Sequence, residues 1–193
     1  MPNYCNFDMH IKGKKENIQH FLNILQTDYN YEDDRVEISC EEQRHMFRIF
    51  DTYVETDMDD FEPGESAYAD VSGECAWSVV SCMCEGDHTY YNDMKKNKNF
   101  KGTTLQKESE TYGLVIEVFS SESGCAFQEH FLYSNGYAVI EDCVGWHENY
   151  YDDDEEEYVI EKGGFPLYRD FTCLSNDMKN FLRMMGEWPE GVY

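Results

Sequence analysis

The chain has 193 residues, of which 41% are hydrophobic and 16% aromatic, so it is long and apolar enough for one domain with a sizeable core. Its 40 acidic residues outnumber its 15 Lys and Arg residues, which gives a formal net charge of −25. Direct binding of nucleic acid or of anionic lipid needs a cationic face, so we expect neither. No run of about 18 apolar residues occurs, so we expect no membrane span.

The amino terminus, MPNYCNFDMHIKG, has no basic region followed by an apolar stretch, so we expect no secretion signal and a cytoplasmic protein. The eight cysteines are then expected to be reduced. They are scattered and include no CxxC pair, which favours small buried side chains over a metal site, and we expect no cofactor. A zinc site assembled from distant Cys and His residues remains an alternative.

The first half of the chain predicts a strand, a helix and two more strands. Apolar and polar residues alternate over 4–11, which is typical of a half-buried strand, and apolar residues follow helical spacing over 15–26. Aromatic and β-branched residues predict a strand over 44–55. A polar loop with a Pro-Gly turn signal, 57–66, precedes a short strand over 67–73.

The second half predicts helices around an antiparallel meander. Residues 74–84 are expected to form a helix with one apolar face, made of Ala76, Val79, Val80 and Met83. A further helix over 103–113 would be capped by Thr103 or Thr104. Asn135-Gly136 is a strong hairpin signal within three successive strands, 114–120, 126–133 and 137–144. A last helix is expected between Ser175 and Gly186.

This order of elements predicts the α+β class, with helices on one face of an antiparallel sheet. We expect a ferredoxin-like arrangement with extra strands and a C-terminal helix. Residues 1–146 would form this domain. Residues 147–193 would add an acidic segment, a loop and the C-terminal helix, packed on the same domain.

Four segments together resemble a known family. They are MPNYCNFDMHIKGKKENIQHFL, GECAWSVVSC, TYYND and VFSSESGCAFQEHFLYSNG. They look like the YubB-type ferredoxin-like domain proteins, which plasmids, phages and other mobile elements of bacteria carry. The resemblance spans roughly residues 1–146. It implies a fold and a genomic setting, but it implies no catalytic residue.

Two acidic regions suggest what the charge does. Residues 28–65 hold 14 acids and three bases, and residues 152–157 are an unbroken row of acids. One interpretation is a solvated tract of mutually repelling charges. The other is mimicry of nucleic acid, because alternate side chains on a strand are about 6.6 Å apart, on the scale of phosphate spacing. We favour mimicry, since a folded region shares the charge and tyrosines accompany the acids as interface anchors.

We therefore predict an acidic inhibitor that blocks the nucleic-acid groove of a bacterial defence nuclease. Phages carry inhibitors of host nucleases, so the resemblance favours an anti-CRISPR or anti-restriction protein whose partner is a CRISPR effector nuclease. Its expected contacts are Asp57, Asp59, Asp60, Glu62, Tyr150, Tyr151, Asp152, Asp153, Asp154, Glu155, Glu156, Glu157 and Tyr158.

Two alternatives remain open. The chain could be a non-catalytic protein-interaction module of a mobile element. It could also be an enzyme that uses His88, Cys84 and Glu129. Glu129 and the adjacent His130 lie on a predicted strand, so they point to opposite faces and cannot form a local acid–base pair.

Overall fold

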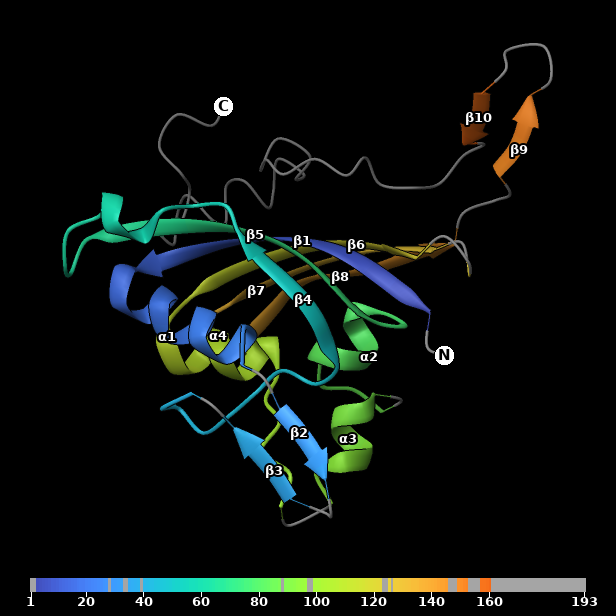
Figure 1. The fold of residues 1–193 in the computed structure, drawn as a ribbon. Coiled ribbons are helices and arrows are strands. Elements are labelled where there is room, and N and C mark those ends of the chain that lie inside the picture. The colour runs from blue at the N-terminus through green and yellow to red at the C-terminus, as the bar shows by residue number, and fades with distance from the viewer. Residues whose placement is uncertain are drawn as a thin grey trace.

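The structure is a computed structural model, and it describes residues 3–27, 29–32, 35–38, 40–87, 89–96, 99–122, 125, 127–145, 149–152 and 157–160. Its main feature is a sheet of six antiparallel strands in the order β4-β5-β1-β6-β7-β8 (Figure 1). These strands are β1 (Tyr4–Lys14), β4 (Ile49–Val54), β5 (Ser66–Ala76), β6 (Val115–Glu122), β7 (Phe127–Ser134) and β8 (Tyr137–Gly145). The helices are α1 (Lys15–Leu25), η1 (Met58–Asp60), α2 (Val79–Met83), α3 (Tyr90–Met94) and α4 (Leu105–Tyr112). The predicted α+β class is confirmed.

Two short antiparallel pairs lie outside this sheet. β2 (Tyr29–Glu32) pairs with β3 (Arg35–Ile38), and β9 (Asn149–Asp152) pairs with β10 (Glu157–Ile160). The helix expected between Ser175 and Gly186 falls outside the described residues.

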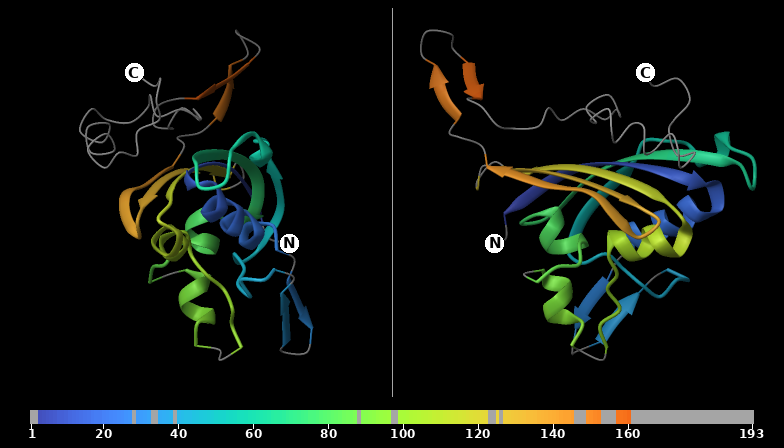
Figure 2. Two further views of the ribbon diagram at one scale, coloured as in Figure 1. Left: turned by 90° about the vertical axis from the view of Figure 1, so that its left-hand side faces the viewer. Right: turned by 180° about the vertical axis from the view of Figure 1, so that it is seen from behind.

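The core lies between the sheet and the helices. Alternate residues of β1 are at most 2% exposed, and they are Cys5, Phe7, Met9 and Ile11. α1 covers this face because its apolar side chains recur at helical spacing, and Ile18, Phe21 and Ile24 are fully buried. Each such side chain stabilises the fold by about 1.5–3 kcal/mol. Figures 1 and 2 show α1, α2 and α4 on the same face of the sheet, as the sequence predicts.

The connections place β1 in the middle of the sheet. The chain leaves β1 through α1, passes along β4 and returns in β5, which pairs with one side of β1. After α4 it enters β6, which pairs with the other side of β1, and β7 and β8 follow as hairpins. The edges of this sheet are therefore β4 and β8.

Local signals in the second half of the chain have the predicted effect. Asn135 and Gly136 have φ values of 47° and 82°, as the tight turn between β7 and β8 requires. The Thr104 side chain accepts a hydrogen bond from Lys107 N at 3.3 Å and so caps α4. Gly113 ends this helix in the left-handed conformation, with φ 61°.

The helix expected over 74–84 is wrong in its first half. Ala76 belongs to β5, where it pairs with Tyr4 of β1, and α2 begins only at Val79. Val80 is 37% exposed, whereas Val79 is fully buried, so the two do not share an apolar face. Pairing with a strand far away in the sequence overrides the local helical pattern here.

Long-range pairing also extends two other predicted strands, β1 and β5. β1 runs on to Lys14 because each of its residues faces a partner in β5, which itself covers 66–76. β4 starts later than predicted, at Ile49, after Arg48 adopts φ 51°. That left-handed residue interrupts the extended chain.

We predict that Gly136→Ala destabilises the protein more than Gly64→Ala. Both glycines have left-handed backbones, with φ 82° and 81°, and an alanine there costs about 1–2 kcal/mol. A Cβ at Gly64 meets nothing within 4 Å, but a Cβ at Gly136 lies 2.8 Å from Glu110 Cβ. Chemical denaturation of both variants measures the difference, and equal losses would contradict the steric argument.

Candidate functional site

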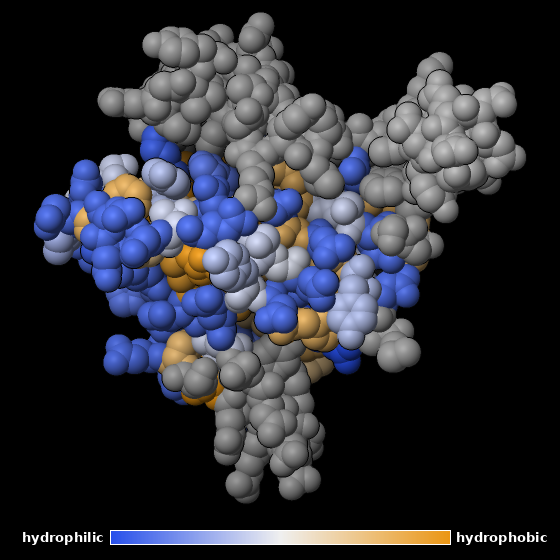
Figure 3. Space-filling model, turned by 45° about the horizontal axis from the view of Figure 1, so that its top comes forward, coloured by the Kyte–Doolittle hydropathy of each residue, from blue (hydrophilic) through white to orange (hydrophobic). Residues whose placement is uncertain are grey.

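The turn between β4 and β5, residues 55–65, carries six acidic residues and no basic one, and we call it the acidic turn. It contains four of the predicted contact residues. Asp57, Asp59, Asp60 and Glu62 are all exposed, and η1 and its flanking residues bring them together. Hydrophilic side chains gather over this end of the sheet, at the left of Figure 3.

The start of α1 holds the acidic turn in place. Lys15 N donates to Glu65 O at 3.0 Å, and Lys15 Nζ donates to Phe61 O at 2.6 Å. Gly64 N donates to the Glu16 carboxylate. Hydrogen bonds from the backbone N–H groups of Glu16 itself and of Gly64 lower the pKa of this carboxyl. Backbone atoms of the segment that follows η1 are therefore fixed to a helix.

Contacts within the acidic turn add to this order. The Asp57 side chain caps η1 by accepting a hydrogen bond from Asp59 N at 2.9 Å. The Phe61 ring packs edge-on against Tyr68 of β5, with 5.4 Å between the ring centroids. The turn thus has one aromatic side chain directed at the sheet and its carboxylates directed at solvent.

The cation beside the acidic turn does little to neutralise it. Lys15 Nζ lies 3.9 Å from Asp59 Oδ1, and the Asp59 side chain is 94% exposed. An ion pair so exposed contributes about 1 kcal/mol at most. The turn therefore keeps a negative potential that a cationic partner could meet.

A hollow over β4, β5 and β1 carries further carboxylates, and we call it the acidic hollow. It is lined by Asn6, Asp8, Asp51, Tyr53, Ser72 and Glu74. Asp51 lies directly opposite Glu74, and like charges in this position destabilise a sheet. Within the described part of the chain, no ion pair joins either of them to a Lys, Arg or His residue. Sequence reasoning missed the hollow because it depends on strand pairing.

The second set of predicted contacts lies in the β9–β10 pair and its connection. Tyr150, Tyr151 and Asp152 belong to β9, and Glu157 and Tyr158 belong to β10. The register sets Asp152 opposite Glu157 and Tyr151 opposite Tyr158. The remaining predicted contacts fall outside the described residues, and they are Asp153, Asp154, Glu155 and Glu156.

Two of the three residues of the enzyme alternative are buried in other roles. Burial raises the pKa of the Cys84 thiol, which holds it in the protonated form that is a poor nucleophile. The Glu129 carboxylate accepts hydrogen bonds from Val79 N at 2.8 Å and Ser120 Oγ at 2.6 Å. The neighbouring His130 does not contribute to this alternative, since its Nε2 lies 2.9 Å from Glu117 Oε1. His88, the third residue of the enzyme alternative, falls outside the described residues.

Three thiols of the core lie close together. Cys5 and Cys75 lie opposite each other on β1 and β5, and both are fully buried, as is Cys82. Hydrogen bonds of the protonated Cys75 thiol with Cys5 and Cys82, together with burial, raise its pKa. Among the residues that the structure describes, no group of three His, Cys, Asp or Glu side chains is arranged to hold a metal ion.

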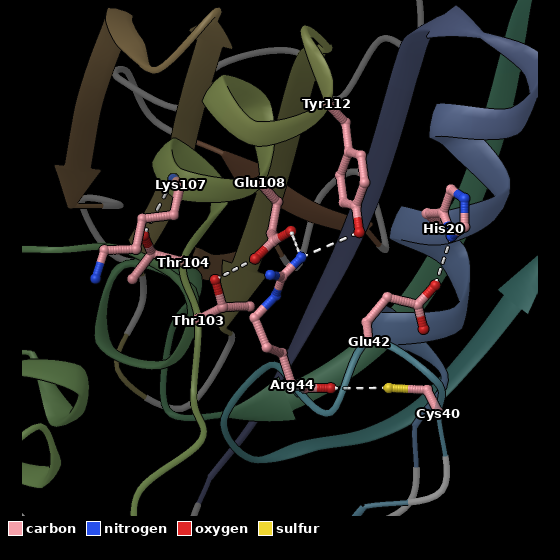
Figure 4. Close-up of polar contacts among 9 residues, drawn as sticks. All are labelled: His20, Cys40, Glu42, Arg44, Thr103, Thr104, Lys107, Glu108 and Tyr112. Carbon is pink, nitrogen blue, oxygen red and sulfur yellow. Dashed lines mark hydrogen bonds and ion pairs between the residues drawn. The ribbon is translucent and has the colours of Figure 1, made fainter.

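A second polar cluster joins the loop before β4 to α4, and we call it the Arg44 cluster (Figure 4). Arg44 Nη2 donates to Glu108 Oε2 at 3.1 Å and to the Tyr112 hydroxyl at 3.0 Å. Thr103 Oγ1 donates to the other oxygen of Glu108. Burial raises the pKa values of Glu108 and Tyr112, and the Arg44 guanidinium acts against both shifts.

α1 reaches the same cluster through His20. Its Nδ1 lies 2.7 Å from Glu42 Oε1, and its ring stacks on Tyr112 with 5.6 Å between centroids. A carboxylate that orients an imidazole could prepare a general base. In the part of the chain that is described, however, no hydroxyl or thiol is hydrogen bonded to His20. We interpret the Arg44 cluster as a structural network, which sequence reasoning missed because its members are far apart in the chain.

Comparisons with family models, with curated proteins and with solved structures find no match to this chain. The longest described helix is α1, with 11 residues, and none of the described helices is long and apolar enough to cross a membrane. The candidate site is therefore defined by its own geometry, as the acidic turn together with the acidic hollow.

We predict that Arg44→Met destabilises the protein by about 2 kcal/mol. The substitution leaves Glu108, 1% exposed, without its countercharge, and breaking a fully buried pair costs about 3–5 kcal/mol. The expected loss is smaller because the Arg44 side chain is 36% exposed. Adding Glu108→Gln keeps an acceptor for Thr103 and should recover part of the loss in urea denaturation. A double variant as unstable as Arg44→Met would refute this account.

We predict that Glu42→Gln removes one step from the acid denaturation of the protein. Burial opposes ionisation of Glu42, but hydrogen bonds from His20 and from its own backbone N–H outweigh burial and lower its pKa below the ordinary 4.5. Stability from this carboxylate is therefore present above pH 4.5 and is lost as the pH falls through the lower, folded-state pKa. Thermal melts of both proteins over this range should converge as the pH falls. A constant difference between them would count against the assignment.

Proposed function

We propose that this chain is an acidic inhibitor that occupies the nucleic-acid groove of a bacterial defence nuclease, as an anti-CRISPR or anti-restriction protein. The observation that carries the proposal is the acidic turn, whose exposed carboxylates sit on a backbone fixed by Lys15 and Phe61. A mimic of the phosphate backbone needs carboxylates that are both exposed and held in fixed positions. Acids on a loose segment would lose conformational entropy on binding.

We further propose that the domain is ferredoxin-like and of the YubB type. The order β1, α1, β4, β5, α4 and β6, with β1 between β5 and β6, supports the split β-α-β arrangement. β7 and β8 would then be the extra strands expected from the sequence. The resemblance to YubB-type proteins concerns these same elements, and it suggests a phage or plasmid protein that acts inside a bacterial cell.

The charge of the whole chain supports the same proposal. A net charge of −25 attracts a cationic groove over a distance, which raises association rates by about 10–10³ and makes them sensitive to salt. A CRISPR effector nuclease holds its heteroduplex in such a positively charged channel. The row 152–157, flanked by Tyr150, Tyr151 and Tyr158, would supply a second set of contacts.

Neutralising the acidic turn should weaken the inhibitor. We predict that the variant Asp57→Asn, Asp59→Asn, Asp60→Asn, Glu62→Gln displaces labelled guide RNA or target DNA from a CRISPR effector nuclease about tenfold more slowly. Asparagine at position 57 can still cap η1, so the turn should keep its shape. Fluorescence anisotropy across a panel of CRISPR and restriction nucleases measures displacement, at about 50 and about 200 mM salt.

A matched control separates position from total charge. The variant Glu85→Gln, Asp87→Asn, Asp93→Asn, Glu110→Gln removes the same charge from exposed residues around α2, α3 and α4, and it should displace nucleic acid almost as well as the parent. Absence of displacement from every nuclease in the panel would overturn the proposal. Binding that survives neutralisation of the acidic turn would favour the alternative of a protein-interaction module.

A further inference from the structure

The edge strand β4 has the features of a docking strand. Among the described residues it is one of the two edges of the six-stranded sheet, and an edge strand presents unpaired backbone N–H and C=O groups (Figure 1). Its outer residues are exposed, with Phe50 at 44% and Tyr53 at 68%. The Phe50 ring packs on the Tyr4 ring with 5.2 Å between centroids, so these two rings form a preorganised aromatic surface beside the edge.

A hollow lies on each side of β4. Tyr53 faces the acidic hollow on the helix-free side, because it pairs with Ser72, which in turn faces Asp8. Its neighbour Val54 faces the opposite side and borders a hollow along α1, lined by Glu16, Gln19, His20, Leu22, Asn23 and Val54. Successive side chains of a strand point to opposite faces, so a strand added to β4 would direct its side chains alternately towards these two hollows.

The chemistry of the two hollows differs. The acidic hollow carries the opposed carboxylates of Asp51 and Glu74 beside the exposed ring of Tyr53. This combination suits the guanidinium of an arginine. The hollow along α1 combines the apolar side chains of Leu22 and Val54 with amides, one carboxylate and the imidazole of His20, and it suits a small or apolar side chain. A segment that complements both hollows as an added strand would therefore alternate cationic residues with small or apolar ones.

Charge also decides against a second copy of this chain as the occupant. Antiparallel pairing of two β4 edges would bring two Asp51 carboxylates close together on molecules that each carry −25. Like charges across an interface cost several kcal/mol. Acidic residues thus protect this edge from self-association and leave it open to a cationic strand.

We propose that β4 accepts an extended cationic segment of the partner protein as an added strand. Arginine or lysine side chains at alternate positions of this segment enter the acidic hollow, and its backbone pairs with β4. The inference rests on the proposed function for the identity of the partner, and it adds the mode of binding. The acidic turn then steers the cationic segment, and β4 fixes its register.

The test uses two synthetic eight-residue peptides as probes for the full chain. One alternates Arg with Val, and the other has the same sequence with every second backbone amide N-methylated, which blocks strand pairing and keeps the charge. We expect the first peptide to bind and to protect the amides of β4 from hydrogen exchange. The methylated peptide should bind at least tenfold more weakly, and the variant Asp51→Asn, Glu74→Gln should weaken binding of the first peptide several-fold.

A control variant, Tyr137→Ser, changes an aromatic residue that is 76% exposed on β8, the other edge, and should not alter binding. Equal affinity for the two peptides would overturn the inference, because charge alone would then explain binding. So would protection of β8 amides in place of β4 amides. Nuclease displacement without strand pairing would leave the proposed function standing and remove this inference. Strand pairing without displacement of nucleic acid from any nuclease would support this inference and overturn the proposed function.

Discussion

The antiparallel pairing of β1 with β5 is the interaction on which the rest of the structure depends. It runs through 11 residue pairs, from Tyr4 opposite Ala76 to Lys14 opposite Ser66. At one end it brings Lys15 to the acidic turn, and along its length it turns alternate residues of both strands into the core. Because β4 is hydrogen bonded to β5, this register also sets where the edge strand and its two hollows lie. Slipping it by one residue would exchange the core and solvent faces of β1.

The sequence predicted those parts of the fold that short-range signals control. Alternation in β1, the turn at Asn135-Gly136 and the cap at Thr104 each act within a few residues, and all three are present. The prediction failed at Ala76, where pairing with Tyr4 decides the conformation. That pairing joins positions that no local pattern relates, so a helical spacing of apolar residues was misleading there.

The candidate site also combines features that local sequence predicts with features that depend on long-range contacts. The density of acids in 55–65 is visible in composition, and so the acidic turn could be predicted from residue types alone. The acidic hollow and the Arg44 cluster could not be predicted. Asp51 meets Glu74 only through strand register, and Arg44 meets Glu108 only because a loop crosses α4. Contacts of this kind follow from the completed fold.

The facing carboxylates of Asp51 and Glu74 have a consequence for how the molecule responds to its medium. Their repulsion is relieved by dissolved counterions, as is that of the many other surplus anions, so the free protein should resemble a mildly halophilic one. Rising ionic strength then favours the folded chain but would oppose the proposed binding to a basic partner. Folding and the proposed association would thus respond to salt with opposite signs, and the ionic strength of the medium would set the balance between them.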